Sequence, residues 1–87
     1  MQKFDITIFC ADGFRIDTEI TCFEDIRAIV DGNVELIPVK NSSLVIACND
    51  QGFKKLPQNA TFPTLAGTIA LIDQDSVNAM PYADNLQ

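Results

Sequence analysis

The sequence predicts an α+β fold, with one main helix packed on one face of a mostly antiparallel sheet of about five strands. Apolar and polar residues alternate over two N-terminal stretches, one later segment has helical spacing, and short apolar runs follow between turn residues. The chain has 87 residues, which is room for one domain with a single core. We expect that domain to occupy residues 1–73.

The two alternating stretches predict strands near residues 3–10 and 14–20. Between them stands Asp12-Gly13. A two-residue type I′ turn requires positive φ at both central residues, and Asp-Gly tolerates this well. The sequence therefore predicts a β-hairpin closed by a type I′ turn.

The one helix is expected near residues 22–31. Thr21 and Glu24 fit a capping box, in which the hydroxyl accepts from a first-turn amide and the carboxylate accepts from the Thr21 amide. Gly32 stands where a residue in the left-handed conformation would end the helix. Three apolar residues recur at helical spacing: Phe23, Ile26 and Val30.

Three further strands are expected near residues 34–39, 44–48 and 68–73. Pro38 cannot donate a ladder hydrogen bond and marks an edge strand. The apolar run 44–48 has no alternation, which is typical of a strand covered on both faces and places it centrally in the sheet. We also expect the first strand to leave a free edge, so that a second copy of the chain could pair with it.

Two segments have no clear period. Residues 53–66 contain two prolines and predict an irregular crossing segment, with one helical turn beginning at Asn59. Residues 74–87 carry isolated apolar residues and predict a loosely ordered C-terminal tail.

The charge of the chain is strongly acidic. Twelve acidic residues against six basic ones give a formal net charge of −6, which disfavours direct nucleic-acid binding because phosphate contacts need clustered Lys and Arg. Residues 1–36 hold eight of the acids and three of the bases. This half could present an acidic face, represented by Asp17, Glu19 and Asp25, to a basic partner; the alternative is that the charge only keeps the protein soluble.

The side chains that most enzymes use are scarce. The chain has no His, no G-x-G-x-x-G or Walker lysine motif and no G-x-S-x-G motif, so we expect a protein that is not an enzyme and needs no cofactor or metal. Three cysteines without a C-x-x-C pair predict reduced thiols: Cys10, Cys22 and Cys48. No apolar run is long enough to span a bilayer, and we expect a cytoplasmic protein.

One group of polar residues could hold a small ligand. Lys54 and Lys55 form the only basic pair in the chain, and loops on a rigid sheet often carry binding groups. A phosphate or carboxylate, such as that of a nucleotide-like signal, would suit them. The alternative is that these residues only build turns. The full set is Asn49, Asp50, Lys54, Lys55, Gln58 and Asn59.

The order of several motifs resembles a family of small domains of unknown function carried by phages and plasmids. These motifs are a Gly before a strand at 32–39, an Asn-Asp-x-Gly turn at 49–52, a Leu-Pro-x-Asn loop at 56–59 and a Gly-Thr strand from residue 67. The resemblance implies an α+β fold and no established activity. It favours a host-takeover or counter-defence inhibitor that binds a host protein; the small-ligand binder remains the alternative.

Overall fold

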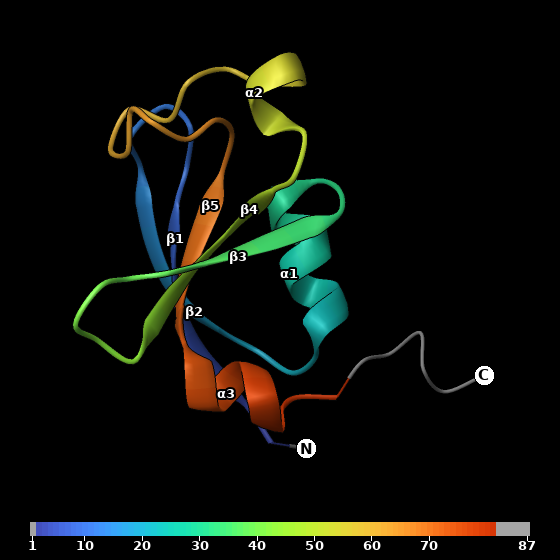
Figure 1. The fold of residues 1–87 in the computed structure, drawn as a ribbon. Coiled ribbons are helices and arrows are strands. Elements are labelled where there is room, and N and C mark those ends of the chain that lie inside the picture. The colour runs from blue at the N-terminus through green and yellow to red at the C-terminus, as the bar shows by residue number, and fades with distance from the viewer. Residues whose placement is uncertain (1, 82–87) are drawn as a thin grey trace.

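The computed structural model describes residues 2–81, without the side chain of Phe53. Within them, five strands form one antiparallel sheet in the order β2-β1-β5-β4-β3 (Figure 1), which confirms the predicted α+β fold. The strands are β1 (Phe4–Phe9), β2 (Arg15–Ile20), β3 (Val34–Pro38), β4 (Leu44–Asn49) and β5 (Ile69–Asp73). The helices are α1 (Phe23–Val30), α2 (Gly52–Lys55) and α3 (Gln74–Ala79).

The middle strand is β5, the last of the five in the sequence. It pairs with β1 on one side and β4 on the other, and so joins two hairpins into one sheet. The strand expected to be central, β4, is an interior strand beside it. The prediction that β1 is an edge strand is wrong, because β5 pairs with its residues 7–9; the edge strands are β2 and β3. Pro38 does lie on an edge strand, as predicted.

The first hairpin closes with three residues rather than two. The Cys10 amide donates to the Phe14 carbonyl at 2.8 Å, and the Gly13 amide donates to the Cys10 carbonyl at 2.9 Å. Of the turn residues only Gly13 has positive φ, at 102°. The type I′ prediction is therefore wrong: the connection has the pattern of a tight turn followed by a glycine bulge.

The N-cap of helix α1 lies one residue later than predicted. Cys22 is the N-cap, and Asp25 rather than Glu24 reaches back, with its Oδ2 accepting from the Thr21 amide at 3.0 Å. Glu24 instead pairs with Arg27 at 2.8 Å. The left-handed residue at the C-terminus is Asp31, with φ 63°, and not Gly32.

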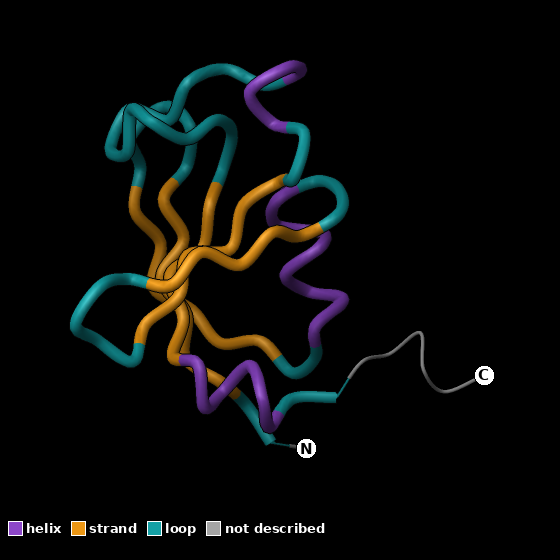
Figure 2. Tube along the Cα trace, in the orientation of Figure 1, coloured by secondary structure: helices purple, strands orange, loops and turns teal. Residues whose placement is uncertain are grey.

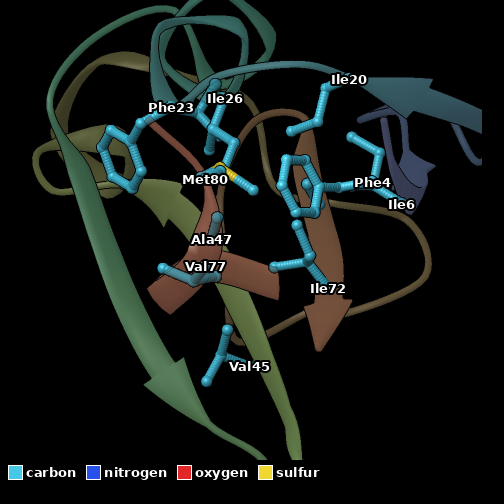
Figure 3. Close-up of a cluster of buried hydrophobic side chains, with 12 residues drawn as sticks. Phe4, Ile6, Ile20, Phe23, Ile26, Val45, Ala47, Ile72, Val77 and Met80 are labelled. Atoms are coloured by element: carbon cyan, nitrogen blue, oxygen red, sulfur yellow. The ribbon is translucent and has the colours of Figure 1, made fainter. Parts of the chain in front are cut away.

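The core lies between one face of the sheet and the helices α1 and α3. Figure 2 shows both helices beside the strands, and Figure 3 shows their side chains meeting the sheet. Ile26 is fully buried, as the helical spacing predicts. Residues from every layer share this cluster, among them Phe4, Ile6, Ile20, Phe23, Val30, Val45, Ala47, Ile72, Val77 and Met80.

Residues 74–79 form helix α3 where a loosely ordered tail was expected. Val77 and Met80 are buried in the core, and the Phe23 amide donates to the Pro81 carbonyl at 2.9 Å. The apolar residues of this segment showed no helical period in the sequence, because the helix has fewer than two full turns. The rest of the expected tail, residues 82–87, lies outside the described residues.

The crossing segment is irregular, as predicted, but no helical turn begins at Asn59. The helical turn lies earlier, at α2, and Gln58 forms an isolated bridge with Ala66. No helix within residues 2–81 is long and apolar enough to cross a membrane.

Candidate functional site

The face of the sheet opposite α1 and α3 is called here the open face. Because side chains alternate along a strand, the residues beside those of the core point to it. On β1 and β2 these are the odd-numbered residues. The face continues across β5 and β4, because Thr7 pairs with Leu71 and Leu71 pairs with Ile46. Leu44, Ile46 and Leu71 are only half-buried there.

One end of the open face is covered by residues 56–67. The ring of Phe62 packs edge-on against that of Phe9, with centroids 5.0 Å apart. Asn59, fully buried, donates to the carbonyls of Phe9 at 3.0 Å and Gly67 at 2.8 Å. This cover leaves the other end of the face, around Leu44 and Leu71, without a layer of chain above it among the described residues.

The uncovered end is a shallow hollow of about 630 Å³. Its floor includes the side chains of Thr7, Leu44 and Leu71. Four carboxylates stand around this floor: Asp5, Asp17, Glu19 and Asp73. An apolar floor with a rim of one charge sign is the composition of a recognition surface, since the floor contributes buried area and the rim selects the partner's charge.

Two of the carboxylates face each other across the ladder. Asp5 of β1 pairs directly with Glu19 of β2. Because antiparallel pairs alternate, the Cys10 to Phe14 hydrogen bond makes Asp5 and Glu19 a non-hydrogen-bonded pair, the kind whose side chains lie closer. Like charges in that position destabilise a sheet. Both residues are exposed, and neither carboxylate has a hydrogen bond or ion pair within residues 2–81.

The other two carboxylates have partners. Asp17 accepts from the Thr7 hydroxyl at 2.8 Å and pairs with Arg15 at 3.4 Å. Asp73 caps α3 by accepting from the Asp75 amide at 2.8 Å, and also accepts from the Ser43 hydroxyl at 3.0 Å. The hollow therefore holds two fixed carboxylates and two without such contacts.

The residues predicted for the acidic face are divided by the sheet. Asp17 and Glu19 lie together at the hollow, whereas Asp25 lies at the start of α1, where its carboxylate accepts from the Thr21 and Cys22 amides. The prediction missed Asp5 and Asp73. The alternation on β1 places Asp5 opposite the core, but only strand order brings Asp73 beside it.

Three residues of the predicted ligand loop instead hold the fold together. The Asn49 amide donates to the carbonyls of Val30 at 3.2 Å and Asp31 at 2.9 Å. Asn59 is the buried anchor described above, and Gln58 donates to the Pro63 carbonyl at 2.6 Å. These amides are used within the chain.

The remaining loop residues do not form a basic pocket. Lys55 lines a hollow of about 300 Å³ that also contains Asp31 and Asp50. Lys54 is exposed and does not line that hollow. Two carboxylates beside one ammonium group oppose capture of an anion.

Cys48 is buried, as predicted, and 4% exposed. Burial raises the pKa of its thiol, and the nearby charges of Glu35 and Asp50 raise it further. All three cysteines are free, and no group of metal-ligating side chains occurs in the part of the chain that the structure describes.

The chain was compared with protein-family models, curated proteins and solved structures, and none of them matches.

Proposed function

We propose that this protein acts by binding, without turnover, and that its open face receives a basic and partly apolar segment of a protein partner. The observation that carries the proposal is the pairing of Asp5 with Glu19 beside an uncovered apolar floor. A Lys or Arg side chain placed between the two carboxylates would remove their repulsion, while its neighbours cover Leu44 and Leu71.

The biological role that we propose is a stoichiometric inhibitor of a host protein, acting in the cytoplasm of a cell invaded by a phage or plasmid. The resemblance of the turn motifs supports the mobile origin. The acidic surface supports the choice of target, because host proteins that bind nucleic acids present Lys and Arg. An acidic face competes for such a surface without any catalytic group.

The test uses a defined probe, an extended fluorescent peptide of alternating Lys and Leu, titrated with the full chain. We expect binding that weakens as salt is raised. The double variant Asp5→Lys, Glu19→Lys should weaken it about tenfold or more, because both unpaired carboxylates are lost and two repulsive charges replace them.

The matched control is Asp50→Lys together with Asp31→Lys, which makes the same change of charge at the loop end of the molecule. Net charge alone would make both double variants equally weak, and that result would contradict the proposal. A third variant, Leu71→Lys, changes the floor and should also weaken binding.

A further inference from the structure

A second exposed surface, apart from the open face, lies on the edge strand β2 and on Phe14, the residue just before that strand. Phe14 is 71% exposed and Ile16 is 47% exposed, and they are the exposed large hydrophobic residues within residues 2–81. Ile16 pairs with Ile8 of β1 on the helix side of the sheet. An exposed apolar pair on a sheet edge is a surface that another strand would cover.

The two edges of the sheet differ in how well they are protected. β3 ends at Pro38, whose missing N–H blocks strand addition. β2 contains no proline over its six residues. Within residues 2–81, no backbone hydrogen bond from another segment reaches the outer side of β2.

The backbone groups available on β2 follow from its pairing with β1. The Cys10 to Phe14 hydrogen bond directs the even-numbered residues of β2 toward β1. Arg15, Asp17 and Glu19 therefore direct their N–H and C=O groups outward. These groups are the ones that an added strand would meet.

We propose that two copies of this chain pair through β2, antiparallel and about a two-fold axis that passes between their Ile16 side chains. In this register Ile16 faces Ile16 of the other copy, and Phe14 faces Thr18. Arg15 faces Asp17 of the other copy, and by symmetry Asp17 faces Arg15. The strand is thus complementary to itself in both apolar contact and charge.

The neighbouring register is less favourable. Moving the axis to Asp17 sets the two Asp17 carboxylates against each other and pairs Ile16 with Thr18. It exchanges one apolar pair for a like-charge pair, which destabilises the ladder. The Ile16-centred register avoids both losses.

The proposed dimer has a geometric consequence. An axis perpendicular to the sheet keeps each face on its own side, so the two open faces form one surface with two acidic hollows. The dimer does not depend on the function proposed for those hollows. It would make binding bivalent if that function holds.

The experiment is sedimentation equilibrium of the full chain from micromolar to near-millimolar concentration. We expect a monomer–dimer equilibrium. Ile16→Lys should raise the dissociation constant about tenfold or more, because two ammonium groups would meet at the axis. Ala28→Lys adds the same charge at an exposed position on α1 and should leave the dimer unchanged. Equal effects of the two variants, or a native chain that stays monomeric throughout, would overturn the proposal.

A charge exchange tests the register. Arg15→Asp alone and Asp17→Arg alone each set like charges opposite each other and should weaken the dimer several-fold. The double variant restores the pairing with reversed signs and should regain the native dissociation constant. With the axis at Asp17, Arg15 would face Glu19, so Asp17→Arg alone would leave the dimer nearly unchanged and the double variant would be as weak as Arg15→Asp alone. That pattern would overturn the register.

A disulfide provides a readout that does not depend on affinity. Ile16→Cys puts two thiols at a non-hydrogen-bonded pair on the axis, where the Cα separation suits a disulfide. Under mild oxidation it should cross-link faster than Thr18→Cys, with the native chain as the control for Cys10 and Cys22. Equal rates for the two variants would contradict the Ile16-centred register.

Discussion

The side-chain amide of Asn59 donates at 3.0 Å to the main-chain carbonyl of Phe9, fifty residues earlier in the chain. Its oxygen accepts from the amides of Thr61 and Phe62, both at 2.9 Å. One buried side chain therefore shapes the turn that follows it and fixes that turn to the end of β1. The cover over one end of the open face depends on this residue.

Asn59→Ala should lower the free energy of unfolding by about 2–4 kcal/mol, because four hydrogen bonds of about 1 kcal/mol each are lost in a buried site. Urea melts at low micromolar concentration would measure it. Gln58→Ala, the neighbouring change at an exposed residue with one such bond, should cost less than about 1 kcal/mol. Equal losses would mean that Asn59 is not the anchor.

Met80→Ala should destabilise the protein by about 2–5 kcal/mol, as expected for a buried large side chain. The exposed residue Asn78, on helix α3 two residues before its C-cap Met80, is the control, and its change to Ala should stay within about 0.5 kcal/mol. Thermal or urea melts would separate the two. A Met80 variant as stable as the native chain would show that α3 is not part of the core.

Gly32 lies against the side chain of Asn49, because a Cβ at Gly32 would come within 2.5 Å of the Asn49 Nδ2. Gly32→Ala should therefore cost more than Gly13→Ala. Both glycines have positive φ, a backbone conformation that costs a residue with a Cβ about 1–2 kcal/mol. At Gly13, however, the atom nearest to an added Cβ is 3.6 Å away. Combining Gly32→Ala with Asn49→Ala should cost less than the sum of the single losses. Equal losses in the two glycine variants would contradict the contact.

The strands and the main helix could be predicted because local signals determine them. Alternation on β1 and β2 and the spacing of Phe23, Ile26 and Val30 each depend on neighbours within a few residues. The first turn was predicted one residue too short, and the cap of α1 was placed one residue too early. The cap was misplaced because two competing side chains, Glu24 and Asp25, stand at adjacent positions.

Strand order and the hollow could not be predicted, because they depend on contacts between distant residues. No local sequence pattern predicts that β5 lies between β1 and β4. This strand order brings Asp73 to the rim of the hollow, together with Asp5 and Asp17. Likewise, Asn49 and Asn59 look like turn residues available to a ligand. Only the fold shows that both amides are used by main-chain carbonyls.

The pKa of the buried Cys48 thiol should lie above its ordinary value of 9.0. A raised pKa means that the folded state holds the proton more tightly than the unfolded state. The protonated thiol therefore contributes to the free energy of unfolding. This contribution is complete at pH values below the pKa of the thiol in the unfolded state, and it is lost as pH rises through the pKa of the thiol in the folded state. Stability should therefore fall above pH 9, and less so in Cys48→Ala. Thiol labelling at neutral pH should reach Cys10 and Cys22 first; rapid labelling of Cys48 in the folded chain would contradict its burial.

The two proposed surfaces should respond to salt in opposite directions. The open face offers carboxylates to a basic partner, so screening should weaken that complex. Two copies that meet through β2 each carry a charge of −6. Salt also screens the long-range repulsion between the two copies, and this favours the dimer. The exposed Arg15–Asp17 pairs contribute at most about 1 kcal/mol each, so screening them weakens the dimer little.

Raising the salt concentration from about 50 to 300 mM, over which the Debye length falls to well under 10 Å, should thus strengthen the dimer and weaken binding of the Lys-Leu peptide. Sedimentation equilibrium and fluorescence anisotropy on the same preparation would measure both. The control is Ile16→Lys, which should lose the salt-strengthened dimer and keep a peptide affinity that falls with salt. If dimerisation instead weakens with salt as peptide binding does, attraction between charges dominates at β2, and the apolar Ile16 contact is not what holds the two copies together.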